Sequence, residues 1–518
     1  MTSLLTDQLR MMAEHYPNEV GYQVLDGGSL TFAEWERTSN RLARGLAGLG
    51  ISKGDRVAVY FETTDALQWI LSYSAIHKAG AVVVPLNIRL APRELALILE
   101  HSGTRALLTA GGLAPTAASL AADTQSLSWL VTGTLDSDDN QRVEADLPSP
   151  QVSRFTEISL KDLLDSDDSA FQVEVTEDDL ADVMYTSGTT GMPKGVAVKH
   201  KSASLLPNAV PPWSNSAWMH SSPLFTFAGI SFVYNPMKLG MTGLYQPQFD
   251  SARWIRAVEE ERPAAAFIVP AMARLLLAYP GFETADLSSI TILAVGSAPI
   301  TPSTLAALQE RMPHAMVTNG YGLTEAGPAF CAMPAGESER HPGSVGKPMP
   351  PMEVRIVEND EDQPAGQVGE VLIRMAGRER EYFNDPEATA RTWVDGWLHT
   401  GDLGYLDEEG YLYLVGRDKE VIIRGGNNIY AIDVESAILE HPGVEDAAVI
   451  GVHHDVLGED IAAFVELRPG TTLSVEELRS FCSERLADYK VPRKVTFVAE
   501  LPRNATGKVM KRLLTPRS

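Results

Sequence analysis

The chain has 518 residues, of which 44% are hydrophobic and 21% are charged, an ordinary composition for a globular protein of about two to four domains. Its 43 Lys and Arg residues against 68 Asp and Glu residues give a net charge of −25, which argues against a nucleic-acid-binding protein and against tight binding to anionic lipid. Two cysteines are too few for a disulfide framework or a thiol zinc site and fit a reducing, cytoplasmic compartment. The sequence predicts neither a signal peptide nor a transmembrane segment.

The charge is unevenly distributed along the chain. Residues 479–518 contain ten Lys and Arg residues and three Asp and Glu residues, so a basic end follows an acidic body. This pattern predicts either that the basic end meets an anion or that it is an ordinary solvated helix and tail.

The first third of the chain alternates helix and strand patterns. Thr31 and Glu34 form a capping-box pattern at the start of a helix that is expected to continue through Leu49. The next expected elements are a strand at 56–61, a helix at 66–80, a strand at 81–86, a helix at 92–101 and a strand at 106–109. Apolar strands that alternate with helices predict parallel sheets covered by helices.

Two later segments predict irregular structure. Residues 132–168 are rich in Asp, Ser and Pro and are expected to form a loop region. Residues 202–237 contain five prolines and no Lys, Arg, Asp or Glu. They cannot form one lipid-facing helix and are expected to be irregular, largely buried lining.

The last third of the chain is richer in strand patterns. Strands are expected at 354–357, 369–374, 447–452 and 461–467. A polar junction at 416–419 precedes the last two, and an amphipathic helix is expected at 475–489. The C-terminal hundred residues are therefore expected to form a small α+β domain.

The strongest local motif is Tyr-Thr-Ser-Gly-Thr-Thr-Gly-Met-Pro-Lys-Gly-Val at 185–196. Glycine-rich turns expose backbone N–H groups that bind phosphate oxygens, and the hydroxyl residues and Lys194 add further donors. Lys194 is followed by Gly195 rather than by Ser or Thr, which excludes a Walker loop and with it a P-loop kinase. The motif predicts a phosphate-binding loop of another kind.

A second motif is Asn-Gly-Tyr-Gly-Leu-Thr-Glu-Ala-Gly at 319–327. Tyr321 can stack on a flat ring, and Thr324 can donate to a phosphate. Glu325 can hold a divalent cation that neutralises phosphate charge. Alone this motif is weak, because Gly-Tyr-Gly turns are common.

Two further motifs follow. In Trp-Leu-His-Thr-Gly-Asp-Leu at 397–403, Asp402 is the kind of carboxylate that accepts hydrogen bonds from two ribose hydroxyls, and Arg417 can donate to the same sugar. Leu-Pro-Arg-Asn-Ala-Thr-Gly-Lys at 501–508 places Lys508 on a glycine turn inside the basic end. Taken singly, the first is typical of a turn and the second of a solvated surface lysine.

In this order and spacing the four motifs resemble those of the adenylate-forming (ANL) superfamily, which includes acyl-CoA synthetases, luciferase-type enzymes and peptide-synthetase adenylation domains. The resemblance covers essentially the whole chain. Gly-Gly-Asn-Asn-Ile-Tyr at 425–430, with Val434 and Glu435, is similar to the acyl-CoA ligase branch. The implied fold is α/β, with a large N-terminal domain (1–417) of parallel-rich sheets layered with helices plus a β-subdomain. A small, mobile α+β lid domain (418–518) would follow, with its hinge at Asp418.

The resemblance also implies chemistry. Family members join a carboxylic acid to AMP from ATP, release pyrophosphate, and transfer the acyl group to a thiol, so the implied cofactors are ATP, Mg²⁺ and coenzyme A. The implied catalytic residues are Lys194, Thr324, Glu325 as the Mg²⁺ ligand, and Lys508 as the charge between carboxylate and phosphate. The implied nucleotide-binding residues are Thr186, Ser187, Gly188, Thr189, Thr190, Gly191, Gly296, Ser297, Ala298, Pro299, Tyr321, Gly322, Asp402 and Arg417.

Family members run the two steps with two orientations of the C-terminal domain. Rotation at Asp418 would withdraw Lys508 and bring the CoA-channel residues Gly425, Gly426 and Asn427 to the site. Small glycines would leave room for the pantetheine arm of CoA. The basic end would then have a function, since it approaches a polyanion.

The acid substrate is less well specified. Segment 202–237 falls where the family builds its acyl pocket, for which the implied residues are Phe225, Thr226, Phe227 and Gly229. The aromatic residues of this segment favour a hydrophobic acid, either long-chain or bulky and polycyclic, but they fit ordinary core equally well. The sequence shows no nearby arginine to pair a second carboxylate, which disfavours a malonate-type substrate.

Several positions depart from the family pattern. Thr226 stands in Pro-Leu-Phe-Thr where the family usually has an imidazole near the substrate carboxylate. Residues 375–383 lack the common Gly-Tyr pattern, and Asn427, Ala431 and Asp433 replace the usual Glu, Pro and Glu. These departures leave open a partial enzyme that only forms the thioester, from an adenylate made by a separate partner enzyme.

Two other functions also remain open. One is an acyl-AMP ligase that loads a separate carrier protein, and the other is a non-catalytic ligand-binding protein on the same fold. Retention of Lys194, Glu325, Asp402 and Lys508 together argues against the second. A homodimer is an expectation drawn from the family.

Overall fold

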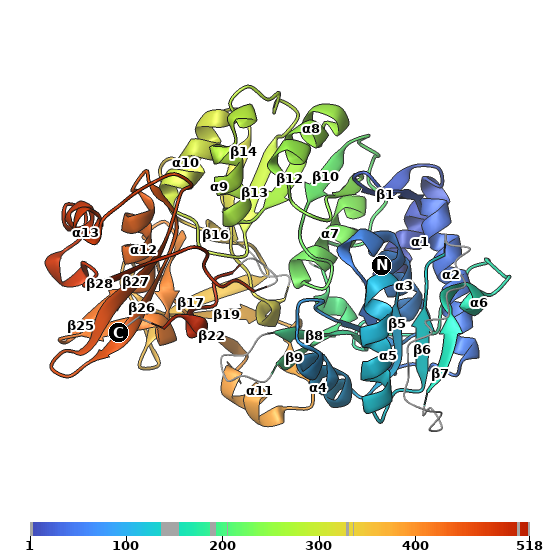
Figure 1. The fold of residues 1–518 in the computed structure, drawn as a ribbon. Helices are drawn as coiled ribbons and strands as arrows, with labels where there is room; N and C mark the ends of the chain where they lie inside the picture. The colour runs from blue at the N-terminus through green and yellow to red at the C-terminus, as the bar shows by residue number, and fades with distance from the viewer. Residues whose placement is uncertain are drawn as a thin grey trace.

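The computed structural model describes residues 4–135, 155–186, 193–204, 206–327, 331–334, 336–504 and 508–515. Within these ranges no helix has both the length and the apolar composition needed to cross a membrane. Two large sheets, a smaller β-sheet region and a C-terminal sheet make up the molecule (Figure 1).

The first large sheet is parallel through its centre and antiparallel at one edge, where β8, β9 and β20 pair. Its strand order is β20 (Glu381–Tyr382), β9 (Lys194–Lys199), β8 (Leu180–Thr186), β4 (Val82–Pro85), β3 (Arg56–Tyr60), β5 (Thr104–Thr109), β6 (Trp129–Thr132) and β7 (Thr156–Ser159).

The second large sheet is parallel except where β1 pairs with β2. Its order is β14 (Met316–Gly320), β13 (Ile292–Gly296), β12 (Ala265–Ile268), β10 (Ala217–His220), β11 (Thr242–Tyr245), β1 (Val20–Val24) and β2 (Ser29–Thr31). The expectation of parallel sheets is therefore confirmed.

Helices lie between the two sheets and on their outer faces. The core between the sheets contains side chains of both sheets and of α1 (Leu5–His15), α2 (Phe32–Gly48), α3 (Ala66–Lys78) and α7 (Phe227–Lys238). Helix α3 is buried on every side, as expected for a helix packed between two sheets. The outer faces are covered by α4 (Pro92–Ser102) and α5 (Ala114–Asp123) on the first sheet, and by α8 (Ser251–Glu261), α9 (Pro270–Ala278) and α10 (Pro302–Arg311) on the second.

A smaller antiparallel region follows. Its strands are β17 (Met352–Glu358), β18 (Glu361–Asp362), β19 (Gly369–Met375), β21 (Trp393–Val394), β22 (Trp397–Leu406) and β23 (Leu412–Arg417). The short pair β15 (Cys331–Ala332) and β16 (Lys347–Pro348) precedes it, and α11 (Pro386–Thr392) lies between β20 and β21.

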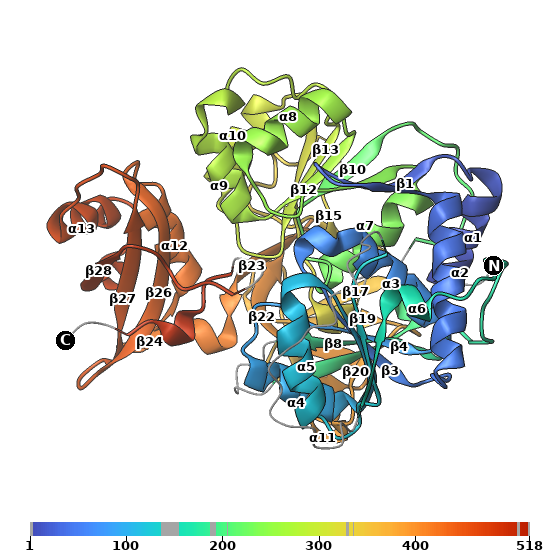
Figure 2. The ribbon, with the colours of Figure 1, turned by 45° about the vertical axis from the view of Figure 1, so that its right-hand side comes forward.

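The C-terminal sheet lies to one side of the rest of the chain in both views (Figures 1 and 2). It consists of β24 (Val421–Arg424), β25 (Asn427–Tyr430), β26 (Val444–His454), β27 (Gly458–Leu467) and β28 (Lys494–Val498), with helices α12 (Ala431–Leu439) and α13 (Val475–Ser483). Its separate hydrophobic core joins one face of the sheet to both helices. The predicted α+β character of this end is confirmed.

Three expectations need correction. Segment 132–168 is not all loop, because β7 and α6 (Leu160–Leu163) lie in it, while 136–154 fall outside the described residues. Segment 202–237 is irregular only in part, since it also forms β10 and most of α7. Its prolines precede α7, apart from Pro236 in the last turn.

The third correction concerns the amphipathic helix expected at 475–489, which ends at Ser483. The backbone becomes extended at Ala487 and then forms a 3₁₀ turn at Asp488–Lys490. The chain therefore leaves the helix six residues before the expected end at 489.

Candidate active site

The candidate site lies where parallel strands of both large sheets end. Thr186 is the last residue of β8, Gly296 ends β13, and Gly320 ends β14 directly before Tyr321. Ligands of α/β proteins bind outside the carboxyl ends of such strands, where loops from different strands meet. Motifs far apart in the sequence therefore converge here because of the sheet topology.

The base of the phosphate loop contacts the second motif. The Thr186 hydroxyl donates to Oε1 of Glu325 at 3.3 Å. Lys194, at the start of β9, places its Nζ 4.6 Å from the centre of the Tyr382 ring, and burial together with Glu325 raises the pKa of Tyr382 to about 12. The predicted phosphate-binding residues Ser187, Gly188, Thr189, Thr190 and Gly191 lie outside the described residues.

Glu325 offers a carboxylate that fits one kind of Mg²⁺ site. In the described part of the chain no three His, Cys, Asp or Glu side chains gather into a metal-binding group, so an all-protein cage is not formed there. Mg²⁺ commonly binds through one or two carboxylates plus substrate phosphates and water. A half-buried Glu325 beside the hydroxyl of Thr186, the residue before the phosphate-loop motif, suits that arrangement.

Asp402 is the centre of the third motif. It lies in β22 and is 7% exposed. Its Oδ2 accepts a hydrogen bond of 2.7 Å from the Tyr321 hydroxyl, and its Oδ1 lies 2.8 Å from Nε of Arg417 on β23. A carboxylate has further lone pairs, so Asp402 can also accept from two sugar hydroxyls while its two neighbours fix its orientation.

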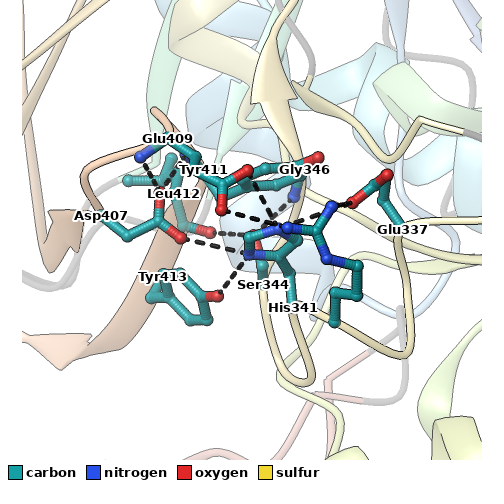
Figure 3. A network of polar contacts seen from close by, with 10 residues as sticks. Glu337, His341, Ser344, Gly346, Asp407, Glu409, Tyr411, Leu412 and Tyr413 are labelled. Carbon is teal, nitrogen blue, oxygen red and sulfur yellow. Dashed lines mark hydrogen bonds and ion pairs between the residues drawn. The ribbon is translucent and has the colours of Figure 1, made fainter.

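The hairpin of β22 and β23 is anchored through His341 (Figure 3). The His341 ring stacks on Tyr411 with centroids 3.5 Å apart, and its Nδ1 lies 3.2 Å from Oδ2 of Asp407. Glu337 and Glu409 approach Nε2 at 3.7 and 3.8 Å. This cluster joins the segment that follows the Tyr321 motif to the hairpin that carries Asp402 and Arg417.

The turn at 296–299 approaches other backbone closely. A Cβ on Gly296 would lie 3.0 Å from the Gly320 carbonyl oxygen and 3.2 Å from the Phe267 ring. Ser297 has a φ of 70°, a region that non-glycine residues seldom adopt. Strained backbone of this kind gathers at ligand-binding turns, and Ala298 and Pro299 continue the turn towards α10.

Lys508 interacts electrostatically with Asp402 and Arg417 of the third motif. Burial lowers its pKa, Arg417 lowers it further, and Glu420 and Asp402 partly oppose the shift. Its backbone N–H donates to Oδ1 of Asn504 at 2.9 Å. Lys508 of the fourth motif thus lies within electrostatic range of Asp402 and Arg417 of the third, although it follows Asp402 by 106 positions in the chain.

The residues predicted to line the acyl pocket, 225–229, lie at the start of helix α7. The Thr226 hydroxyl accepts from the Gly229 N–H at 3.0 Å and donates to the Pro223 carbonyl at 2.7 Å, so Thr226 is the N-cap of α7. Phe225 and Phe227 are partly exposed, whereas a Cβ on Gly229 would lie 2.1 Å from the Pro223 carbonyl oxygen. Other aromatic residues of the segment are core, notably Phe232 and Tyr234.

Comparison with known proteins agrees with this geometry. A family profile described as AMP-binding enzyme matches residues 9–383, and one described as AMP-binding enzyme C-terminal domain matches residues 433–508. The chain belongs to the AMP-binding enzyme family.

Two curated relatives are a feruloyl-CoA synthase from an Amycolatopsis species and a ligase from Rhodococcus jostii. The first is 36% identical over 94% of this chain and 93% of its own. The second is named 3-[(3aS,4S,7aS)-7a-methyl-1,5-dioxo-octahydro-1H-inden-4-yl]propanoyl:CoA ligase. It is 35% identical over 95% of this chain and 94% of its own. A solved anthranilate CoA ligase in complex with anthranoyl-AMP is 25% identical with a TM-score of 0.84, over 98% of this chain and 96% of that one. The chain therefore falls in the acyl-CoA ligase branch of the family and is an acid–thiol ligase.

The segment that the family resemblance assigns to CoA lies apart from the nucleotide residues. Gly425 and Gly426 form the turn between β24 and β25 with φ values of 57° and 84°, and the Asn427 amide donates to the Arg424 carbonyl. Figure 1 draws this hairpin on the far side of the C-terminal sheet. Asp418 opens a 3₁₀ turn, Asp418–Glu420, directly after β23; Asp418 and Lys419 are exposed, and Glu420 is partly buried beside Lys511.

Sequence reasoning missed Arg380, which lies beside the segment expected to form the acyl pocket. The sequence showed no nearby arginine to pair a second carboxylate; the Arg380 guanidinium lies 4.5 Å from the centre of the Phe227 ring, but its terminal nitrogens donate to the backbone carbonyls of Thr324 and Ser202. The signal was present in the charged run Arg-Glu-Arg-Glu at 378–381 and in Asp182, a carboxylate within the otherwise apolar strand β8. A charged residue in a buried strand indicates a buried counter-charge elsewhere in the chain.

Proposed function

We propose that the chain is an ATP- and Mg²⁺-dependent acyl-CoA ligase that activates a hydrophobic carboxylic acid through an acyl-adenylate. The observation that carries this proposal is the convergence of four remote motifs. Thr186 bonds Glu325, Tyr321 and Arg417 bond Asp402, and the Lys508 charge lies in the field of Asp402 and Arg417.

In the first step an oxygen of the substrate carboxylate attacks the α-phosphorus of ATP, and pyrophosphate leaves. Asp402 would hold the ribose, oriented by Tyr321 and Arg417, while Thr186, Lys194 and Thr324 would bind phosphate oxygens. Mg²⁺ held by Glu325 would supply positive charge to the phosphates. Lys508 would stabilise the negative charge that accumulates between the carboxylate and the α-phosphate, which is electrostatic catalysis.

In the second step the CoA thiol attacks the acyl carbon, and AMP leaves. Residues 1–417 would keep the adenylate, and residues 418–518 would rotate about Asp418 to withdraw Lys508. The 3₁₀ turn that Asp418 opens, with Asp418 and Lys419 exposed, is suited to a backbone change. The same rotation would bring the turn at Gly425 and Gly426 to the acyl group, and a turn without Cβ atoms leaves room for the pantetheine arm.

The acid class is proposed as long-chain or bulky and polycyclic. Partly exposed Phe225 and Phe227 lie at the start of α7 in a segment without charged residues, which suits an apolar ligand. The names of the two relatives describe an aromatic and a bicyclic acid, and both acids are bulky.

A thioester-forming half-enzyme is the second candidate. The observation in its favour is Thr226, whose hydroxyl is used to cap α7 at the position where an imidazole is usual. Such an enzyme would receive its adenylate from a separate adenylating enzyme.

Two parallel assays with mass-spectrometric detection separate the candidates. One supplies ATP, Mg²⁺, CoA and a panel of hydrophobic acids, and the other supplies preformed acyl-adenylates and CoA. Acyl-CoA and AMP from the first assay are expected and would identify the acid class. Product from the second assay alone would support the half-enzyme. No product from either would contradict both, and the first assay with a carrier protein in place of CoA would then test the remaining acceptor.

A further inference from the structure

Arg380 is a buried cation in the connection between β19 and β20. It is 3% exposed. Its two terminal nitrogens donate to the backbone carbonyls of Thr324 and Ser202, the second at 2.6 Å. Its Nε has no hydrogen-bond partner in the described part of the chain, and a Cβ on Gly327 would lie 3.0 Å from that atom. The guanidinium is thus enclosed by backbone from separate parts of the chain.

The charges around Arg380 belong to the candidate site. Burial lowers the pKa of Arg380 to about 10, and the carboxylates of Asp182 and Glu325 oppose that shift together with Tyr73. Asp182 accepts from the Tyr73 hydroxyl at 3.1 Å and lies on β8, the strand that ends at Thr186. The Arg380 charge therefore interacts electrostatically with both carboxylates, one on the strand that leads to the phosphate loop and one proposed to bind Mg²⁺.

Arg380 also contacts the acyl-pocket side. Its guanidinium packs over the Phe227 ring at 4.5 Å, and Phe227 is the first residue of α7, directly after the Thr226 cap. One side chain thus contacts the Thr324 backbone, the Ser202 backbone at the end of the turn after β9, and the first turn of α7. A planar guanidinium holds its donors in fixed directions towards two separate carbonyls, whereas the three donors of an ammonium group rotate.

We propose that Arg380 is a positioning residue that fixes the Thr324–Glu325 segment relative to the start of α7, so that the phosphate-binding and acyl-binding sides of the site keep one geometry. Arg380 does not touch the reacting atoms. It acts through Thr324, Glu325 and Phe227. This inference rests on the proposed function, because it assigns Arg380 to the adenylation half-reaction.

The test compares Arg380→Lys and Arg380→Gln with the wild type in each half-reaction. Arg380→Gln removes the charge and one bonding direction, and we expect kcat for adenylation to fall by roughly 10- to 100-fold, the size of effect that a small misplacement of reacting groups causes. The KM for the acid should change by less than about threefold, because the groups that bind the acid directly are retained. Arg380→Lys keeps the charge and should recover part of kcat. Thioester formation from a preformed adenylate should stay near the wild-type rate.

A readout without turnover accompanies the kinetics. Calorimetric binding of Mg·ATP in the absence of acid should weaken in Arg380→Gln and less so in Arg380→Lys. The matched control is Arg378→Gln, since Arg378 lies on the same connection and also donates to a backbone carbonyl, that of Ser204. This control should match the wild type in both measurements.

The outcomes distinguish a failure of the proposed function from a failure of the role proposed for Arg380. A wild type that forms no adenylate with any acid would contradict the proposed function itself. A wild type that forms adenylate, while Arg380→Gln and Arg378→Gln behave alike, would overturn the role of Arg380. Equal losses in both half-reactions, in proportion to a lower folded fraction measured by circular dichroism, would reduce Arg380 to a structural residue and also overturn the inference.

Discussion

At the scale of single residues, the candidate site is held together by carboxylates that already have protein partners. Asp402 is bonded by Tyr321 and Arg417, and Glu325 is bonded by Thr186. Such contacts set the direction of each carboxylate before a ligand arrives, which reduces the ordering that binding requires. Substitutions at these positions should therefore affect ligand binding more strongly than folding.

Asp402→Asn tests the proposed ribose contact. The substitution keeps the shape of the side chain but removes the charge that faces Arg417 and the sugar hydroxyls. A hydrogen bond to a charged group is worth about 1.5–3 kcal/mol, so we expect ATP binding to weaken by roughly 10- to 150-fold, measured by calorimetry. Glu353→Gln, which alters an exposed carboxylate paired with Arg374 in the same β-sheet region, should leave ATP affinity unchanged. Equal affinities for both variants would contradict the role of Asp402.

Lys508 should give the adenylation step an alkaline limit. Burial, reinforced by Arg417, lowers the pKa of Lys508 below its ordinary value of 10.5. A lowered lysine pKa means that the cation is present below that pKa and is lost as the pH rises through it. The adenylation rate should therefore fall at a lower pH than a solvated lysine would give, and thioester formation from a preformed adenylate should not show this limit.

Lys508→Arg provides the control for that titration. The guanidinium stays charged to a much higher pH, so the alkaline limit should move upward even if the altered geometry lowers the rate. Profiles of pyrophosphate exchange against pH for the two proteins measure this shift. An unmoved limit would assign the titration to another group.

At the scale of elements, Thr226 links a departure in the sequence to the start of a helix. The Thr226 hydroxyl satisfies the Gly229 N–H at the first turn of α7, a backbone donor that has no partner within the helix. A residue that seemed from the sequence to be only a lost imidazole therefore has a structural function.

Thr226→Ala should lower the free energy of unfolding by about 1 kcal/mol, the usual cost of losing an N-cap, whereas Thr226→Ser should keep it. Urea denaturation measures the difference. Ser231→Ala is the matched control on the same helix, because the Ser231 hydroxyl donates to the Phe227 carbonyl, a contact that contributes little to helix stability. A loss in Ser231→Ala as large as that in Thr226→Ala would contradict the capping argument.

A helix is predictable from the sequence when the residues that define its start lie close to each other in the chain. The helix α2 is confirmed, with its Thr31 and Glu34 capping box, because both residues of the signal are adjacent to the helix start. Helix α7 was missed because the prolines before it dominate the composition of 202–237, although they lie outside the helix. The motifs around Asp402 and Lys508 were recognisable by order and spacing. The charged run at 378–381 and Asp182 within β8 indicated a buried charge, but Arg380 itself was missed because its direct partners are backbone carbonyls and an aromatic ring from remote parts of the chain.

At the scale of the whole molecule, the C-terminal sheet is joined to the rest by direct ionic contact as well as by the chain. Arg274 on α9 lies 2.9 Å from Oδ2 of Asp446 on β26, and the pair is largely buried. Arg503 also bonds Asp446, so Asp446 would keep a partner within the C-terminal part under the rotation that we propose. Lys508 is within electrostatic range of Asp402 in this same arrangement. The Arg274 contact should therefore stabilise the orientation that serves adenylation.

Arg274→Gln should lower the rate of adenylation and spare thioester formation. A loss of about 1 kcal/mol from this orientation corresponds to roughly a fivefold change in its population relative to the others, and high salt should weaken the same contact in the wild type. Arg262→Gln removes an exposed pair with Asp286 elsewhere in the N-terminal part and should leave both half-reactions unchanged. The test compares two rates in each variant: adenylation, measured by pyrophosphate exchange, and thioester formation from a preformed adenylate. If Arg274→Gln slows both steps equally, the contact stabilises the fold rather than one of two domain orientations.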